Sequence, residues 1–272
     1  MVKIRPFLKW AGGKYDLIED IVALLPSNKR TLIEPFVGSG VVFLNTHYKH
    51  YILNDINPDL ITLYQILKDR PSEYIQDVKI FFSGQYNTEK KYYQIRKQFN
   101  SSQDAYERSL LFLVLNRHCY NGLTRYNQNK EFNVPFGRYK SPYFPEDELF
   151  AFSEKAKKAR FICQDFEKAM KQARNNSTCY CDPPYVPLSE TASFTNYSGD
   201  GFDLNEQERL AKVAERMSLS GIPVLISNHA TPYTKKLYTK AECQYLNVRR
   251  SISSKITDRK KVKEVLAMYQ NN

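Results

Sequence analysis

Apolar residues follow two periods along this chain, and these periods separate a strand-rich part from a helical part. Short apolar runs predict buried strands, whereas apolar positions spaced by three and four residues predict amphipathic helices. Strands are expected from Thr31 onward and over 51–55, 160–164, 178–181, 224–227, 244–250 and 262–269. Helices between them are expected over 17–25, 41–45, 145–158 and 167–173, from an N-cap at Asp203 to Leu219, and over 232–240. Such an alternation is typical of an α/β fold.

Residues from 57 to about 140 interrupt the alternation. Their apolar spacing, as in Leu60 and Leu63, predicts helices rather than strand-helix-strand units. These helices are expected over 58–68, 71–82, 88–99 and 104–119. The chain is therefore predicted to contain one domain made of residues 1–56 and 141–272, with a helical lobe of residues 57–140 inserted into it.

The strand over 178–181 runs into Asp182-Pro183-Pro184-Tyr185. Neither proline can donate to a sheet ladder, so Asp182 must lie at the strand's carboxyl end, where open α/β sheets bind ligands. We interpret this tetrad as a catalytic site for methylating an amino group attached to an aromatic ring. The Asp182 carboxylate and the Pro183 carbonyl would accept the N–H bonds of that group, and Tyr185 would stack on a flat base. An ordinary strand-to-loop transition is the alternative.

A glycine turn and an acid predict a nucleoside site. Glu34-Pro35-Phe36-Val37-Gly38-Ser39-Gly40 places a tight turn between a strand and a helix, and the next strand ends in Asp55. This order is typical of half a nucleotide-binding unit whose acid holds a ribose diol. Asp55 follows Gly40 by 15 residues, fewer than the roughly 20 usual for dinucleotides, and the full glycine fingerprint is missing. A nucleoside without a pyrophosphate is therefore expected.

Two further segments could contact such a ligand. Phe7–Lys14 places Gly12, Gly13 and a lysine before a helix, a turn that could hold a carboxylate, although a plain loop fits equally well. Asp165-Phe166 closes the strand over 160–164. An acid and a ring at a strand end can hold the amino edge and the face of an adenine.

Residues 116–139 combine arginines, amides and aromatic rings around a polar turn at 127–130. Short extended stretches on both sides of that turn predict a hairpin. Residues of these types read base edges in a groove or fill the space that an extruded base leaves. A solvated basic hairpin without a ligand is the alternative.

Composition adds expectations about partners and compartment. The 272 residues carry a formal net charge of +11, which favours a polyanionic partner. The basic residues from Arg249 to Lys261 predict a phosphate-contacting loop, with ordinary solvated charge as the alternative. Residues 188–202 predict a loop that either orders over a substrate or is simply mobile.

The cysteines and histidines favour a reducing compartment and no metal. The five cysteines are odd in number and show no disulfide framework, and the four histidines lack metal-ligand spacing. No apolar leader and no stretch long enough for a membrane span is visible in the sequence. We therefore expect a soluble, cytoplasmic protein without metal.

Together these pieces resemble the Dam-type, D12-class DNA adenine-N6 methyltransferases. The resemblance covers nearly the whole chain and is carried by Phe7–Lys14, Glu34–Gly40, Asn116–Tyr139, Asp182–Tyr185 and Arg249–Ser254. It implies a Rossmann-like, S-adenosylmethionine-dependent methyltransferase sheet, mostly parallel with an antiparallel carboxyl-terminal strand. The domain of residues 1–56 and 141–272 would be catalytic. The lobe of residues 57–140 would recognise the target through a β-hairpin at about 117–139.

The implied reaction is methylation of adenine N6 in GATC of double-stranded DNA, with base flipping and direct in-line transfer. The resemblance implies cofactor contacts for Trp10, Lys14, Phe36, Gly38, Asp55 and Asp182, and the strand-end argument adds Asp165 and Phe166. It implies DNA contacts for Lys9, Tyr120, Asn121, Leu123, Arg125, Pro135, Arg138 and Tyr139.

Within that DNA-contacting set the implied roles differ. Tyr120 and Asn121 match residues that insert where the adenine leaves the stack. Leu123, Arg125 and Pro135 match base readers on one side of the target, and Lys9 and Tyr139 match readers of the other. Arg138 is better interpreted as a hairpin support or phosphate contact. Lys255-Ile256-Thr257-Asp258 stands where the family has a glycine-containing turn.

Two other functions remain open. One is a methyltransferase for structured RNA or for a protein amide, and the other is a DNA-binding regulator with a vestigial active site. The hairpin suits a wide duplex groove better than A-form RNA, and an intact tetrad argues against decay. The resemblance further implies a nucleoid-associated monomer whose mark serves DNA replication and mismatch repair.

Overall fold

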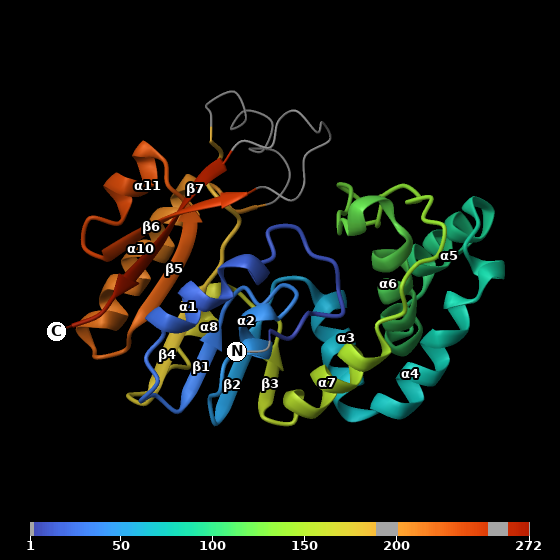
Figure 1. Ribbon diagram of the computed structural model, residues 1–272, viewed down its shortest axis with the longest axis horizontal. Coiled ribbons are helices and arrows are strands. Elements are labelled where there is room, and N and C mark those ends of the chain that lie inside the picture. Colours follow the sequence, from blue (N-terminus) through green and yellow to red (C-terminus); the bar gives the residue numbers. More distant parts are fainter. Residues whose placement is uncertain (1–2, 189–200, 250–260, 272) are drawn as a thin grey trace. The chain divides into compact units, whose positions relative to one another are not determined.

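The computed structural model describes residues 3–188, 201–249 and 261–271, and in this part of the chain seven strands form one sheet (Figure 1). The strand order is β3-β2-β1-β4-β5-β7-β6. The strands are β1 (Thr31–Glu34), β2 (His50–Asn54), β3 (Ala159–Ile162), β4 (Ser177–Cys181), β5 (Val224–His229), β6 (Glu242–Arg249) and β7 (Lys261–Tyr269). Every strand predicted from the sequence is present, and each predicted end lies within two residues of the observed one.

The pairing of the strands confirms the predicted α/β methyltransferase topology. Strand β4 pairs in parallel with β1 on one side and with β5 on the other. The last strand, β7, runs antiparallel to both β5 and β6. Because β1 and β4 are neighbours although far apart in sequence, the order of the strands reverses between them. Ligands of open α/β sheets bind at such a reversal, beyond the carboxyl ends of the strands.

The chain divides into two compact units, which are described separately. The first unit comprises Met1–Tyr15, Val37–Thr46 and Leu53–Gln164, and the second comprises Asp16–Phe36, His47–Ile52 and Asp165–Asn272. The predicted boundary at residues 57–140 differs from this division, because Met1–Tyr15, Val37–Thr46 and residues 53–56 and 141–164 also belong to the first unit. The assignment of 57–140 to target recognition remains a prediction.

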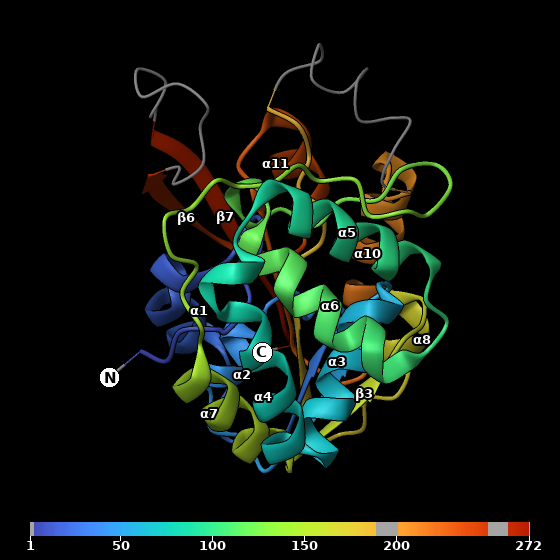
Figure 2. The same cartoon turned by 90° about the vertical axis from the view of Figure 1, so that its right-hand side faces the viewer.

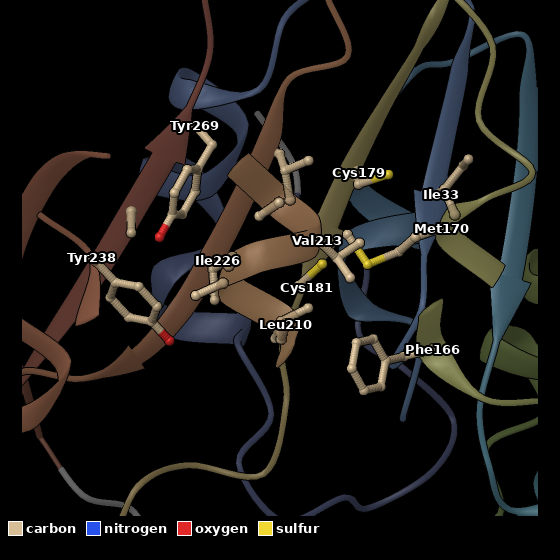
Figure 3. Packing of buried hydrophobic residues seen from close by; sticks show 14 of the residues in the cluster. Ile33, Phe166, Met170, Cys179, Cys181, Leu210, Val213, Ile226, Tyr238 and Tyr269 are labelled. Carbon is tan, nitrogen blue, oxygen red and sulfur yellow. The ribbon is translucent and has the colours of Figure 1, made fainter. Parts of the chain in front are cut away.

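In the second unit, helix α10 (Leu204–Leu219) covers one face of the sheet. Asp203 caps it by accepting a hydrogen bond from the backbone N–H of Glu206 at 2.9 Å, as predicted. Apolar residues of α10, such as Leu210 and Val213, pack against Cys179 and Cys181 of β4 (Figure 3). The other helices in the described residues of this unit are α1 (Ile18–Leu24), α8 (Phe166–Met170) and α11 (Pro232–Leu237).

The four helices predicted in the inserted lobe are all present in the first unit (Figure 2). Residues 111–118 of α6 are all buried, because this helix packs against α3, α4 and α5. A helix that is apolar on all sides is expected at such a central position. The helices of the unit are α2 (Val41–Asn45), α3 (Pro58–Asp69), α4 (Pro71–Lys79), α5 (Glu89–Ser101), α6 (Ala105–His118) and α7 (Glu146–Ala156), and short 3₁₀ turns cover 80–82, 84–86 and 120–122. A further 3₁₀ turn, Tyr15–Leu17, belongs mostly to the second unit.

The hairpin prediction needs one correction. Helix α6 ends at His118, close to the end of the helix predicted over 104–119, so the hairpin begins later than predicted and Asn116 and Arg117 are buried helical residues. In place of two strands, the described hairpin has two isolated bridges, Cys119–Phe136 and Tyr126–Phe132. The expected substrate loop at 188–202 and the basic loop at 249–261 fall largely on residues 189–200 and 250–260, which lie outside the described residues.

Candidate active site

The predicted catalytic acid lies directly after the central strand β4, which ends at Cys181. Ser227 of the neighbouring strand β5 donates a hydrogen bond to Asp182 Oδ1 at 2.8 Å. The hydroxyl of Tyr180 lies 3.0 Å from the same Ser227 oxygen. These contacts hold the carboxylate at the end of the sheet and orient it. Ser227 was not predicted as a site residue, because in the sequence it is one polar residue at the end of an apolar strand.

The rest of the tetrad is held through its backbone and its ring. Gln207 Nε2 donates to the carbonyl oxygen of Pro184 at 2.7 Å, and the N–H of Val186 donates to Asn228 Oδ1 at 3.0 Å. The Tyr185 hydroxyl donates to Glu264 at 2.8 Å. Burial and the nearby Asp182 charge raise the pKa of Tyr185 well above its usual value, so its hydroxyl stays protonated.

His229 further restricts the Tyr185 ring. The two rings meet edge to face with their centroids 4.7 Å apart, and His229 Nδ1 lies 2.8 Å from the Val186 carbonyl oxygen. The Tyr185 side chain is therefore fixed at its ring and at its hydroxyl.

The cysteines of β4 are poor nucleophiles. Cys179 and Cys181 are fully buried free thiols, and burial raises the pKa of both above the usual value. Because the thiolate is the nucleophilic form of cysteine, neither residue is suited to form a covalent intermediate. They pack instead against α10.

In the first unit, the acid predicted to hold a ribose diol closes the glycine turn. Asp55 accepts hydrogen bonds from the backbone N–H groups of Gly38 at 3.1 Å and Asn57 at 3.0 Å. Burial raises the pKa of the Asp55 carboxyl. The carbonyl oxygen of Gly38 accepts a hydrogen bond from the Tyr64 hydroxyl at 2.6 Å. The turn is therefore held from both of its sides.

Gly38 cannot carry a side chain in this turn. Its φ is +47°, and a Cβ atom would lie 2.9 Å from the indole nitrogen of Trp10. The structure thus brings together three of the predicted cofactor contacts, Trp10, Gly38 and Asp55. Lys14, a fourth, is buried and donates to the carbonyl oxygen of Gly12 in its own glycine turn.

In the second unit, the acid and ring predicted to hold an adenine have partners within the protein. Asp165 accepts from the N–H of Glu167 at 3.0 Å and so caps α8, and it pairs with Arg209 at 2.5 Å. Burial opposes ionisation of Asp165, but the Arg209 guanidinium lowers its pKa below the usual value. The same guanidinium lies 4.2 Å from the centroid of the Phe166 ring. Arg209 was not predicted from the sequence as a partner of these two residues.

The Phe166 ring also contacts a second aromatic ring. Its side chain is buried, and its ring stacks on Phe36 with the centroids 5.4 Å apart. Phe36 follows β1 and is partly exposed. Of this pair, Phe36 is thus the more accessible ring, and an adenine contact by Asp165 and Phe166 remains a prediction.

The hairpin of the first unit is anchored by its buried side. Asn100 of α5 holds both backbone groups of Phe132, at 2.9 Å to its N–H and 3.2 Å to its carbonyl oxygen. The Tyr92 hydroxyl donates to the carbonyl oxygen of Val134 at 2.7 Å, and the Tyr126 hydroxyl donates to Asp59 at 2.7 Å. Burial of these residues leaves the opposite side of the hairpin facing solvent.

The residues predicted to contact DNA are all exposed or partly exposed. Arg125 is exposed, and its Nε donates to Asn133 Oδ1 at 2.7 Å, which extends and orients the guanidinium. Asn121 adopts the left-handed conformation, with φ of 54°, at the tip of a 3₁₀ turn. The other members of the predicted set are either exposed (Tyr120, Pro135, Arg138) or partly exposed (Leu123, Lys9, Tyr139).

Lys9 and Tyr139, predicted to read the same side of a target, lie together. The Lys9 ammonium is 4.0 Å from the centroid of the Tyr139 ring. Burial and the neighbouring Arg117 charge lower the pKa of Lys9. The geometry is that of a cation held over an aromatic face.

The described residues contain neither a metal-binding cluster nor a membrane-spanning helix. Across 3–188, 201–249 and 261–271, no group of three or more His, Cys, Asp or Glu side chains is placed to hold a metal ion. In the same ranges, none of the helices has the length and apolar character needed to cross a membrane.

Comparison with known proteins gives close matches over nearly the full length. A family model described as D12 class N6 adenine-specific DNA methyltransferase matches residues 10–252. The chain is 54% identical over 270 residues to the DNA adenine methylase of Escherichia coli K12, covering 99% of this chain and 97% of that protein. It is 51% identical over 271 residues to the DNA adenine methylase of Serratia marcescens, covering 99% of this chain and 100% of that protein.

Solved structures give weaker matches. A precorrin 8w decarboxylase from Methanobacterium thermoautotrophicum has a TM-score of 0.41 and 9% identity, covering 94% of this chain and 90% of that one. A human methyltransferase 10 domain containing protein has a TM-score of 0.37 and 8% identity, covering 94% and 79%. Likeness at this level carries no argument about activity.

Proposed function

Since the chain belongs to the D12 class of N6 adenine-specific DNA methyltransferases, we propose that it transfers a methyl group from S-adenosylmethionine to adenine N6 in GATC of duplex DNA. The target base would be flipped out of the helix, because the reacting nitrogen of a stacked base is out of reach. The observation that carries this proposal is the Asp182 carboxylate, fixed by Ser227 at the end of β4 and followed by the braced Tyr185.

The residues of the first unit suit a nucleoside that carries an amino acid. Asp55 is a partly buried carboxylate beside a glycine turn, suited to accept hydrogen bonds from a ribose diol. Trp10 and Lys14 would contact the rest of the cofactor, and Gly38 leaves room that a Cβ atom would fill. Phe36, Asp165, Phe166 and Asp182, which belong to the second unit, are the other proposed cofactor contacts. When bound, S-adenosylmethionine supplies a methyl group already activated on a sulfonium, for direct in-line transfer.

The chain's own residues would position the amino group and stabilise its developing charge. The Asp182 carboxylate and the Pro183 carbonyl would accept the two N–H bonds of the adenine amino group and turn its lone pair out of the ring. Tyr185 would stack on the flipped base. Such fixed acceptors act by orientation and by electrostatics at the positive charge that forms on nitrogen. The product ammonium is strongly acidic, so a strong base is unnecessary.

Recognition of DNA would come from the first unit. The open side of the hairpin presents Arg125, Leu123 and Pro135, residue types that contact base edges in the major groove. Tyr120 and Asn121 would fill the space of the departed adenine, and Lys9 with Tyr139 would read the other side of the target. The net charge of +11 supports a polyanionic partner. We extend the proposal to a nucleoid-associated monomer whose mark serves replication and mismatch repair.

A methyl-transfer assay with three substrates tests this function. Labelled S-adenosylmethionine is supplied with a GATC duplex, with a duplex of the same composition but scrambled order, and with a structured RNA. Transfer to the GATC duplex alone is expected, at adenine N6. Transfer to the RNA would favour an RNA methyltransferase, and sequence-specific binding without transfer would favour a regulator.

A further inference from the structure

Two buried carboxamides hold the peptide groups on either side of Tyr185. Gln207 of α10 donates from Nε2 to the carbonyl oxygen of Pro184 at 2.7 Å. Asn228 of β5 accepts at Oδ1 from the N–H of Val186 at 3.0 Å. The two carboxamides are themselves joined, since Asn228 Nδ2 donates to Gln207 Oε1 at 3.0 Å. One continuous hydrogen-bonded path therefore spans the backbone of Tyr185.

The orientation of both carboxamides follows from their partners. The N–H of Val186 can only donate, so it requires the oxygen of Asn228, and the carbonyl of Pro184 can only accept, so it requires the nitrogen of Gln207. This leaves Asn228 Nδ2 facing Gln207 Oε1, a donor facing an acceptor. Asn228 Nδ2 also donates to the Tyr238 hydroxyl at 3.0 Å. Flipping either carboxamide would place its nitrogen against another donor and its oxygen against another acceptor.

This network is not required for filling the core. Gln207 is 3% exposed and Asn228 is 0% exposed, and burying a carboxamide is unfavourable unless its hydrogen bonds are made. Leucine or methionine at these places would fill similar volume without that requirement. What the polar pair provides, and an apolar pair cannot, is a fixed direction for the Pro184 carbonyl and the Val186 N–H.

We propose that Gln207 and Asn228 are positioning residues for methyl transfer, which fix the backbone of the Asp182–Tyr185 tetrad so that Tyr185 faces the target base. The inference rests on the proposed function of the tetrad. Tyr185 is then set by three separate restraints, namely the carboxamide pair, the hydrogen bond to Glu264 and the edge contact with His229. A small rotation of this peptide would shift both the ring and the neighbouring Pro183 carbonyl, and misplacement of about 1 Å can reduce a rate by about 10²-fold.

The test compares Gln207→Leu with a matched control, Tyr238→Phe. Both variants remove a buried hydrogen-bond partner of Asn228. Only Gln207→Leu also removes the donor to the Pro184 carbonyl, because Tyr238 is hydrogen-bonded to Asn228 and not to Pro184. We measure single-turnover methyl transfer to a GATC duplex, duplex affinity and thermal unfolding. Gln207→Leu is expected to lower the rate about 10²-fold with duplex affinity changed less than about twofold, whereas Tyr238→Phe stays within about threefold of wild type.

Equal rates for Gln207→Leu and Tyr238→Phe would overturn the inference. A rate loss in Gln207→Leu that the fraction of unfolded protein fully explains would overturn it too. If Gln207→Leu does not fold, Gln207→Glu keeps the shape of the side chain and removes the donor to Pro184, and the same rate loss is expected at neutral pH. Retention of the wild-type rate by Gln207→Glu would also overturn the inference. Failure of the proposed function is distinguishable, because wild type itself would then transfer no methyl group to the duplex.

Discussion

Asn116 holds both backbone groups of Lys9. Its Oδ1 accepts from the Lys9 N–H at 2.9 Å and its Nδ2 donates to the Lys9 carbonyl oxygen at 2.7 Å. The same nitrogen lies 3.3 Å from the carbonyl oxygen of Gly122, and a Cβ atom on Gly122 would lie 2.3 Å from that of Lys9. The segment that continues into Trp10 is therefore tied, within the first unit, to the turn that carries Tyr120.

Asn116→Leu should weaken both the cofactor site and DNA recognition. It leaves the Lys9 N–H and carbonyl without their buried partner, which should lower the free energy of unfolding by about 1–3 kcal/mol, as measured by denaturant titration. Trp10 and the Tyr120 turn are both expected to shift, so affinities for a cofactor analogue and for a GATC duplex should fall together.

Asn100→Leu is the matched control, because Asn100 makes the same two-sided contact with Phe132. It should weaken discrimination of the target sequence and leave affinity for the cofactor analogue unchanged. If Asn116→Leu affected DNA binding alone, Lys9 would not link the two sites.

Removing the carboxylate of Asp182 should abolish methyl transfer without unfolding the protein. Asp182→Ala is expected to lower the single-turnover rate by at least about 10³-fold while duplex affinity persists. Ser227→Ala removes only the hydrogen bond that orients the carboxylate, and a loss of about tenfold, or ~1.4 kcal/mol, is expected.

Asp104→Ala provides the control for that experiment. Asp104 caps α6 by accepting from the N–H of Glu107 at 2.7 Å, so its loss should lower the free energy of unfolding by about 1 kcal/mol and leave the rate unchanged. Near-normal turnover by Asp182→Ala would remove the proposed role of that residue.

Acidification should weaken cofactor binding, and the loss should begin at a higher pH than it would for an aspartate with the usual pKa. Burial raises the pKa of Asp55, and only the ionised carboxylate can accept both hydroxyl groups of a ribose diol. As the pH falls through this raised pKa, the acceptor is lost and the dissociation constant of a cofactor analogue should rise, as titration calorimetry would measure. Asp55→Asn should bind weakly at all pH values. A pH dependence shared by wild type and Asp55→Asn would assign it to another group.

The sequence revealed the positions that depend on local rules. Prolines end β4 and so place Asp182, and the glycine turn before Val41 follows from positive φ values at Gly38 and Gly40. By contrast, the partners of these residues come from distant segments. Asn228 lies within an apolar strand and Gln207 within an amphipathic helix, and nothing in either pattern tells which polar side chain points inward.

The start of the hairpin was placed too early for the same reason. Asn116 and Arg117 lie at the end of the helix predicted over 104–119, and they were also assigned to the hairpin because they are polar, but α6 is helical to His118 and buries both. Arg117 donates to the carbonyl oxygens of Tyr143 and Phe7 and so connects chain segments rather than facing solvent. Tertiary contacts of this kind decide whether a polar residue belongs to the surface.

Arg125→Ala should relax recognition at one base pair of the target. The side chain is exposed and oriented by Asn133, and a guanidinium held in one direction can donate two hydrogen bonds to a guanine edge. Loss of that contact should reduce discrimination against a changed base pair at one position by about 1–3 kcal/mol, measured as competition between GATC and each single-substituted duplex. Arg138→Ala is the control. The Arg138 guanidinium lies 3.8 Å from the Glu89 carboxylate and is suited to phosphate contact. Its loss should therefore weaken binding of all the duplexes equally. Uniform weakening by Arg125→Ala would make it a phosphate contact too, and the base-reading role would have to come from Leu123 or Pro135.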